Sequence, residues 1–446
     1  MNVLFVNPSW DGLVSKRGRR YNRAWPPLDL LYGAALAEAE GAEVRLLDAR
    51  AEPASPEEVG RAGAWADLVV LTSSPLDRWQ CPNLDLDRFR DFLAPLPKDR
   101  LYVTGVHGTA YPEQMLEISG GRGVLRGDPE FGIRDLVRGR APADIPGLGW
   151  MDGTRVVKNR DAEAVEMDDL PTPAYRLLDP NRYGYELLGE CFTLLEASRG
   201  CPFSCAYCSL LMYGRRVRFR SPQKVADDVA AAIEKGGARC GYFIDLEFTV
   251  NRKWVLAVSA ELERRRFDFP WCVQTRADTV DREMLGAMRR AGCRLIHFGV
   301  ETGSPEVMKA IDKRMDLEEV VQAIRWTKEV GIESACFFMV GMPGETETQM
   351  EETIRFSQRL NPTYASFHVA TPYPGAPWYP SSGAPPGLPY AESFPGALPK
   401  PILTRMARRG TRRFYLRPAY IASRVRRGNP RSWARQARLF MSFARS

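Results

Sequence analysis

The sequence is poor in cysteine and very poor in histidine. Its 446 residues include nine Cys and three His. Nine cysteines are too few for a disulfide scaffold of this length, and an odd number leaves at least one thiol unpaired. No apolar run approaches the roughly 18 residues of a membrane-spanning helix, and the first residues lack the charged and apolar segments of a secretory signal peptide. We therefore expect a cytoplasmic protein whose cysteines are free thiols or metal ligands.

Acidic residues are missing from the carboxyl-terminal tail. Residues 393–446 contain 13 Arg and one Lys but no Asp or Glu, so this tail carries +14 in a chain of net charge +7. Arginine alternates with aromatic and aliphatic residues over 411–427. Such a pattern is typical of a helix packed on the protein with Arg stems over apolar surface, or of a membrane-surface segment. We favour the packed tail, with a membrane surface as the alternative and nucleic acid as the least favoured partner.

The first 150 residues alternate short apolar runs with helical stretches. Residues 28–40 are apolar nearly all round, as expected for a helix packed on a sheet. Strand candidates lie at 3–7, 43–49, 66–74 and 100–105. This order predicts a Rossmann-like, doubly wound parallel sheet, whose ligands bind at the carboxyl ends of its strands.

The same alternation resumes after a segment rich in Pro, Gly and Asp. Further strand candidates lie at 192–198, 241–245, 271–275, 294–301, 334–341 and 364–370. Six β/α units predict a partial (β/α)6 barrel with its active site at the strand carboxyl ends. The expected α/β architecture comprises a Rossmann-like domain (1–140), a linker (141–190), the barrel domain (191–390) and a small basic helical region (391–446).

Three cysteines follow the first barrel strand within eight residues. Cys201, Cys205 and Cys208 lie on a loop that opens with Gly200. Structural zinc normally takes four ligands, and no fourth Cys or His lies nearby in the sequence. Three thiolates suit an iron–sulfur cluster with one iron left open to another ligand. The remaining cysteines, at 81, 191, 240, 272, 293 and 336, lie mostly in apolar runs and are expected to be small buried hydrophobic residues.

The spacing C-x-x-x-C-x-x-C, with Tyr207 before the last Cys, resembles the radical S-adenosylmethionine (SAM) superfamily. The rest of the chain resembles the branch that carries an N-terminal cobalamin-binding domain. This resemblance implies a 4Fe-4S cluster on Cys201, Cys205 and Cys208. The open iron would chelate SAM, and one electron would cleave SAM to methionine and a 5′-deoxyadenosyl radical.

The resemblance also assigns SAM contacts to the ends of the barrel strands. The expected contacts are Tyr207 beside the adenosyl group, Asp245 or Glu247 for the ammonium group, Arg276 for the carboxylate, Glu301 for the ribose hydroxyls, and Gly341 and Gly344 for backbone approach to the adenine. Each has a structural alternative: a carboxylate can cap a helix, an arginine can pair within the fold, and a Pro-Gly turn needs no ligand.

The stretch 104–113, TGVHGTAYPE, resembles the loop that lies against the corrin in this branch. His107 and Thr109 are therefore expected to contact cobalamin. Trp79 is expected near the lower corrin face, with packing at a domain interface as its alternative. The Asp-x-His-x-x-Gly motif, whose histidine coordinates cobalt in other cobalamin proteins, is absent. The resemblance thus implies a cobalt without a protein ligand underneath.

These inferences predict a cobalamin-dependent radical SAM methyltransferase that methylates an unactivated carbon of a small molecule, for example a natural product. An electron donor such as flavodoxin or ferredoxin would be its protein partner. One alternative keeps both cofactors but carries out cyclisation or ring rearrangement without methyl transfer. An alternative of another class is a basic nucleic-acid or membrane-binding protein with a structural metal site.

Overall fold

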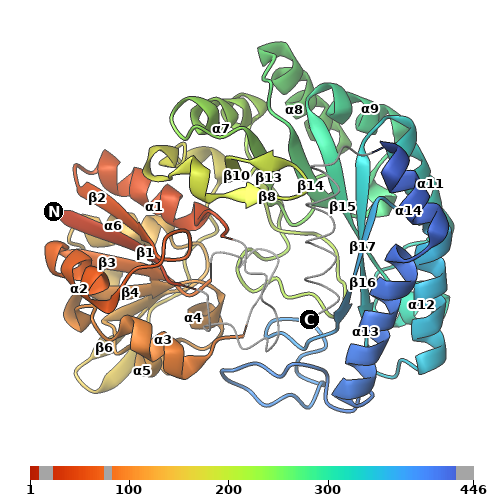
Figure 1. Ribbon diagram of the computed structural model, residues 1–446. Coiled ribbons are helices and arrows are strands. Elements are labelled where there is room, and N and C mark those ends of the chain that lie inside the picture. Colours follow the sequence, from red (N-terminus) through yellow and green to blue (C-terminus); the bar gives the residue numbers. More distant parts are fainter. Residues whose placement is uncertain (10–23, 75–82, 428–446) are drawn as a thin grey trace.

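The computed structural model describes residues 1–9, 24–74 and 83–427 (Figure 1). Two separate sheets organise these residues, one of seven strands and one of six. The predicted α/β class is confirmed, including the Rossmann-like sheet, the partial barrel and helices near the carboxyl end.

The seven-stranded sheet has the order β2-β1-β3-β4-β5-β6-β7. Its first five strands are parallel, whereas β6 and β7 are antiparallel. Its strands are β1 (Asn2–Asn7), β2 (Glu43–Asp48), β3 (Leu68–Thr72), β4 (Leu101–Thr104), β5 (Gly123–Leu125), β6 (Leu148–Asp152) and β7 (Arg155–Lys158). Its helices are α1 (Leu28–Ala39), α2 (Pro56–Trp65), α3 (Leu86–Leu93), α4 (Val106–Ala110), α5 (Pro112–Ser119) and α6 (Glu130–Val137), with 3-10 turns at Lys98–Arg100 and Pro142–Asp144.

Close packing of helix α1 on this sheet explains its all-round apolar sequence. Its residues from Leu28 to Ala34 are all buried. A Cβ atom at Gly33 would lie 2.7 Å from Ile133 Cδ1 and 3.1 Å from Phe5 Cε1. Only glycine therefore lets α1 lie this close to both α6 and β1.

The segment predicted as a linker supplies part of the first sheet. Leu148 of β6 pairs with Leu125 of β5, and β7 then pairs with β6. We therefore propose that the N-terminal domain extends to Lys158 instead of ending at residue 140. The remaining connection contains 3-10 turns and a short hairpin, at Met167–Asp169, Tyr175–Leu177, Pro180–Arg182, β8 (Gly184–Tyr185) and β9 (Gly189–Glu190).

The six-stranded sheet is a partial barrel of parallel strands in the order β10-β13-β14-β15-β16-β17. Figure 1 shows its strands in an arc with helices on the outer side. The strands are β10 (Phe192–Leu195), β13 (Cys240–Phe243), β14 (Trp271–Thr275), β15 (Cys293–Glu301), β16 (Glu333–Val340) and β17 (Tyr364–Val369). The outer helices are α7 (Pro222–Glu234), α8 (Arg252–Arg265), α9 (Arg282–Arg290), α10 (Pro305–Ala310), α11 (Leu317–Glu329) and α12 (Glu347–Leu360). A short pair, β11 (Ser198–Arg199) and β12 (Arg218–Phe219), brackets the cysteine loop, and a 3-10 turn spans Ala277–Thr279.

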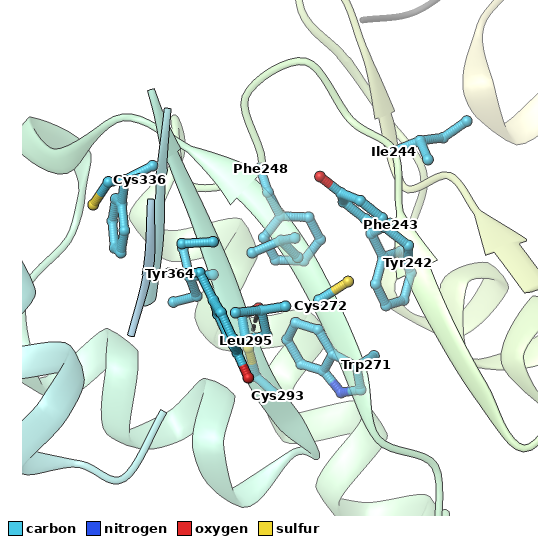
Figure 2. Close-up of a cluster of buried hydrophobic side chains, with 14 of the residues drawn as sticks. Tyr242, Phe243, Ile244, Phe248, Trp271, Cys272, Cys293, Leu295, Cys336 and Tyr364 are labelled. Carbon is cyan, nitrogen blue, oxygen red and sulfur yellow. Dashed lines mark hydrogen bonds between the residues drawn. The ribbon is translucent and has the colours of Figure 1, made fainter. Parts of the chain in front are cut away.

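The barrel core is aromatic and contains several thiols (Figure 2). Cys272, Cys293 and Cys336 are at most 1% exposed among residues such as Trp271 and Phe248, which confirms their predicted role as small hydrophobic residues. Cys191 differs, because it is only partly buried and has a φ of +54°. Cys81 lies outside the described residues.

The basic tail packs back on the barrel as α13 (Lys400–Tyr415) and α14 (Pro418–Arg427). Leu403, Met406 and Phe414 are buried in the barrel core cluster. On the neighbouring helix α12, Glu351 pairs with both Arg409 and Arg413. The packed-tail prediction is thus confirmed for α13. No helix among the described residues is both long and apolar enough to cross a bilayer.

Candidate functional site

The cysteine loop begins directly after β11 at Gly200. Its φ is +90°, and a Cβ atom there would overlap the carbonyl oxygen of Arg216. The next residue, Cys201, donates its backbone N–H to the Gly214 carbonyl at 3.2 Å. Glycine therefore allows the chain to turn sharply out of the barrel and deliver the first cysteine.

The three thiols of this loop are partly buried near one another. Burial, with a smaller contribution from the neighbouring Cys205, raises the pKa of Cys201 to about 11 and that of Cys208 to about 12. Together the thiolates need a cationic centre to be stable at neutral pH. Within the described ranges, no three His, Cys, Asp or Glu side chains are grouped to hold a single metal ion. Three thiols on one short loop fit a multi-iron cluster, in which each cysteine would bind a different iron.

A second loop, residues 311–315, holds the cysteine loop in place. Ile311 O accepts the Ala206 N–H at 2.9 Å, and Asp312 Oδ2 accepts the Ser204 hydroxyl at 2.7 Å. Asp312 and Arg314 both have a φ of +52°, so the backbone is bent to turn these groups towards the cysteines. This loop carries no glycine and no recognisable motif, so its role could not be predicted from the sequence.

A buried charged pair lies beside the loop. Lys313 Nζ donates to Glu301 Oε1 at 2.7 Å and to the Tyr207 hydroxyl at 3.2 Å. Burial alone would lower the pKa of Lys313, but the Glu301 carboxylate outweighs it and raises that pKa. Burial, and then Glu301, raise the pKa of Tyr207. The structure thus brings predicted residues Tyr207 and Glu301 together through a lysine that sequence reasoning did not identify.

Arg276 lies at the end of β14 with its side chain committed to protein groups. Its Nε and Nη2 donate to the two carboxylate oxygens of Asp278 at 2.8 and 2.5 Å. Nη1 points to Cys205 Sγ at 3.6 Å, and Nη2 also donates to the Lys313 carbonyl at 2.7 Å. The guanidinium carbon lies 4.0 Å from the centre of the Phe203 ring.

Asp245 and Glu247 are buried carboxylates that accept hydrogen bonds from the protein. Asp245 accepts from Ala197 N at 3.1 Å and from the Ser198 hydroxyl at 2.6 Å. Glu247 accepts from Arg276 N at 2.9 Å and from the Thr279 hydroxyl at 3.0 Å. Burial raises both pKa values, that of Asp245 to about 7. Glu247 therefore binds the backbone of Arg276, and Asp245 binds the turn between β10 and β11.

The two predicted glycines have different surroundings. Gly341 has a φ of +88°, and a Cβ atom there would lie 2.7 Å from Leu403 Cδ1 of α13. Gly344 has a φ of +76° and no atom that its Cβ would meet within 4 Å. Gly341 is thus required by helix packing, whereas Gly344 faces open space. Glu345, the residue after Gly344, is buried. Its Oε2 accepts hydrogen bonds from Gly341 N at 2.6 Å and from Met342 N at 3.0 Å.

Substitution of Glu345 by glutamine is expected to change the pH dependence of stability. Burial raises the pKa of Glu345 to about 7, so between about pH 4.5 and 7 the folded state holds a proton that the unfolded state has released. Stability of the wild type therefore falls as pH rises through this window. The Glu345→Gln variant lacks this proton, so the wild type should lose up to about 3 kcal/mol relative to it across the window.

Denaturant unfolding of both proteins at pH 5 and pH 8 measures this change. The amide oxygen of the variant still accepts from Gly341 and Met342, which makes it a conservative replacement. An unfolding free-energy difference that is equal at the two pH values would contradict the raised pKa.

The predicted cobalamin contacts lie at the strand ends of the first sheet. His107, on α4, is fully buried, with Nδ1 3.0 Å from the Ser73 hydroxyl. Its ring stacks on Tyr390 with ring centres 5.5 Å apart. Thr109 donates its hydroxyl to Gly105 O and accepts from Gly127 N. Trp79 lies outside the described residues.

A segment from the carboxyl side of the barrel reaches these strand ends. The Asn83 amide donates to Tyr390 O at 2.8 Å and accepts from Tyr390 N at 2.5 Å. The Gln114 amide binds the backbone N–H and carbonyl of Leu388 in the same way. Two side-chain amides of the first domain therefore hold the segment beside His107. Sequence reasoning missed both amides, because they bind backbone and leave no motif.

A buried ionic cluster joins the first domain to the start of the cysteine loop. Arg199 pairs with Asp128 at 3.1 Å, Glu130 at 2.5 Å and Glu196 at 3.0 Å, and Arg218 also pairs with Asp128. All five side chains are at most 3% exposed. Burial raises the pKa of Glu130. Because Arg199 precedes Gly200, this cluster fixes the origin of the cysteine loop against the first domain.

Comparison with known proteins agrees with this arrangement. Residues 195–357 match the model of the radical SAM superfamily. An uncharacterized methyltransferase of Pyrococcus horikoshii is 28% identical over 84% of this chain and 82% of its own length. The anaerobic magnesium-protoporphyrin IX monomethyl ester cyclase of Cereibacter sphaeroides is 27% identical over 85% of this chain, which spans only 63% of that protein.

Among solved structures, the fold is similar to that of the radical SAM methyltransferase TsrM of Kitasatospora setae, which contains cobalamin and a [4Fe-4S] cluster. The TM-score is 0.70 at 21% identity, over 85% of this chain and 74% of TsrM. The cobalamin-dependent SAM radical enzyme OxsB matches with a TM-score of 0.65 at 20% identity, over 81% of this chain and 52% of OxsB. The superfamily match and the curated relatives confirm the resemblance drawn from the cysteine loop, and the two solved structures show that the fold is shared.

Proposed function

Because this chain carries a radical SAM domain behind a Rossmann-like N-terminal domain, we propose that it methylates an unactivated carbon of a small molecule, such as a natural product, in a cobalamin-dependent reaction. One observation carries the proposal. The Cys201–Cys208 loop begins where Arg199 joins the barrel to Asp128 and Glu130 of the N-terminal domain. This contact supports a proposal in which the cluster ligands and the strand ends of the N-terminal sheet contribute to one site.

When bound, the cofactors would supply the reactivity: the cluster would provide the electron for reductive cleavage of SAM, and cobalamin would carry the methyl group. The residues of the chain itself would bind these cofactors and orient them. Cys201, Cys205 and Cys208 hold the cluster. Glu301, at the end of β15 and paired with Lys313, would accept hydrogen bonds from the SAM ribose. Gly344 leaves room for the adenine beside the backbone.

The N-terminal domain holds cobalamin in the same proposal. His107 and Thr109 lie at the carboxyl end of β4, where ligands of parallel sheets bind. His107 is buried and its Nδ1 lies 3.0 Å from the Ser73 hydroxyl, so it would support the loop that lies against the corrin. The other two histidines of the sequence are on β15 and β17 of the barrel. His107 is therefore the one histidine of the sequence that lies at the strand ends of this domain.

Two further parts of the proposal concern the surroundings of the protein. An electron donor such as flavodoxin or ferredoxin reduces the cluster. The protein works in the cytoplasm, where thiols stay reduced.

The first alternative is a cyclase or ring-rearranging enzyme that uses the same cofactors without methyl transfer. The similarity to magnesium-protoporphyrin IX monomethyl ester cyclases favours keeping it. The second alternative, a basic nucleic-acid or membrane-binding protein, rested on the charge of the tail. Ion pairs between α13 and α12 engage Arg405, Arg409 and Arg413, which counts against it.

Anaerobic turnover separates the first two functions. Reconstituted protein is incubated with cobalamin, dithionite, SAM bearing a deuterated methyl group, and a small-molecule extract of the source cells. Methyl transfer is expected to give S-adenosylhomocysteine, 5′-deoxyadenosine and a metabolite that has gained the deuterated methyl group, all detected by mass spectrometry. Formation of 5′-deoxyadenosine with a changed but unlabelled metabolite would contradict methylation and support the cyclase alternative.

A further inference from the structure

Arg276 places a hydrogen-bond donor on the central cysteine of the loop. Its Nη1 lies 3.6 Å from Cys205 Sγ, whereas Nε and Nη2 are held by Asp278. The side chain is 6% exposed and stacks on Phe203. The guanidinium is therefore fixed from several sides, and its remaining edge is turned to the cysteine.

This arrangement conflicts with the carboxylate-binding role expected from the sequence. An arginine binds a carboxylate best through two parallel N–H bonds, and Asp278 already accepts such a pair. A third bond from Nη2 to the Lys313 carbonyl uses another donor. To grasp the carboxylate of SAM in the same way, Arg276 would have to release Asp278.

We propose that Arg276 is a positioning residue that sets the reduction potential of the cluster through its N–H bond to Cys205, in place of binding the SAM carboxylate. The proposal rests on the proposed function only in requiring a cluster on the three cysteines. Hydrogen bonds to cluster sulfurs and nearby charge are among the features that set such potentials.

The direction of the effect follows from charge. Reduction adds one negative charge to the cluster and its thiolates, and a cation in contact with a thiolate stabilises that added charge. The site is buried, so the interaction is weakly screened. Lys313 is a second cation beside the loop, and both cations are paired with a carboxylate, Lys313 with Glu301 at 2.7 Å and Arg276 with Asp278 at 2.5 Å. Arg276 differs because its Nη1–H points directly at Cys205 Sγ at 3.6 Å, where the added charge is stabilised. Arg276 should therefore raise the potential and make the cluster easier to reduce.

The test compares Arg276→Gln with the wild type in an EPR-monitored redox titration of the reconstituted, SAM-free protein. The glutamine variant should have a lower midpoint potential, by about the 59 mV that corresponds to a tenfold change in the one-electron equilibrium. Arg276→Lys keeps the positive charge but lacks the planar guanidinium group, so its midpoint potential should fall by less. Arg252→Gln removes an exposed arginine that also has two acidic partners, so it should leave the potential unchanged.

SAM affinity is measured on the same samples by anaerobic equilibrium dialysis. Iron content is measured first, and if the glutamine variant does not assemble a cluster, the lysine variant carries the comparison. A lower potential with unchanged SAM affinity supports the proposal. An unchanged potential overturns it, and so does a loss of SAM affinity of about tenfold or more, the amount expected when a charge-assisted bond to the ligand is removed. A wild type without bound iron would instead refute the proposed function itself.

Discussion

Replacement of Cys201, Cys205 and Cys208 by alanine is expected to remove all of the roughly four irons that the reconstituted chain should bind. Each cysteine would bind a different iron of the cluster. Without the three cysteines, the loop has no thiolate left to hold any iron. SAM cleavage should disappear with the iron. Iron analysis and the visible and EPR spectra of the anaerobically reconstituted variant measure this result.

A matched control uses a cysteine outside the loop. Cys191 is partly exposed and lies before β10, away from the loop in sequence. Cys191→Ala should therefore bind as much iron as the wild type. If the triple variant keeps its iron, or if Cys191→Ala loses it equally, the cysteine loop is not the cluster site.

Substitution of Arg199 by methionine is expected to have the largest effect on stability. Arg199 is fully buried and bonded to Asp128, Glu130 and Glu196. Methionine fills a similar volume but leaves three buried carboxylates with one arginine, Arg218, beside them. Removal of one partner from a buried ionic cluster typically costs about 3–5 kcal/mol. Denaturant unfolding of the iron-free chain should show a loss of this size.

Arg182 provides the control for this prediction. It also spans the two parts of the chain, because it pairs with Glu52 and Asp179, but its side chain is 45% exposed. An exposed pair contributes about 0–1 kcal/mol, so Arg182→Met should have little effect. Equal unfolding free energies for the two variants would show that the buried cluster does not hold the N-terminal domain to the barrel.

The positions of the parallel strands could be predicted from the sequence because parallel, buried strands are continuous apolar runs, whereas the order of the strands across each sheet was not predicted. Val3–Val6 and Leu68–Leu71 are examples in which every residue is buried. The antiparallel pair β6–β7 was not predicted. It lies in a Gly- and Asp-containing stretch, and its strands are partly exposed, so their periodicity is weak.

The candidate site was predictable only where residues close in sequence act together. The three cysteines meet this condition. Lys313 does not, because its partners Glu301 and Tyr207 come from elsewhere in the chain. Arg276 was identified by its place at a strand end, but its binding to Asp278 and its approach to Cys205 depend on side-chain geometry. Charged pairs formed across a fold leave no local pattern in the sequence.

The central claim is that one chain combines SAM, an iron–sulfur cluster and cobalamin for methyl transfer. The most direct test incubates anaerobically reconstituted protein with cobalamin, dithionite and SAM that bears a deuterated methyl group, followed by gel filtration and mass spectrometry of the protein-bound corrin. The claim predicts that methylcobalamin elutes with the protein and carries the deuterated methyl group, together with S-adenosylhomocysteine. A corrin that separates from the protein, or one that stays bound but never acquires the label, would contradict it.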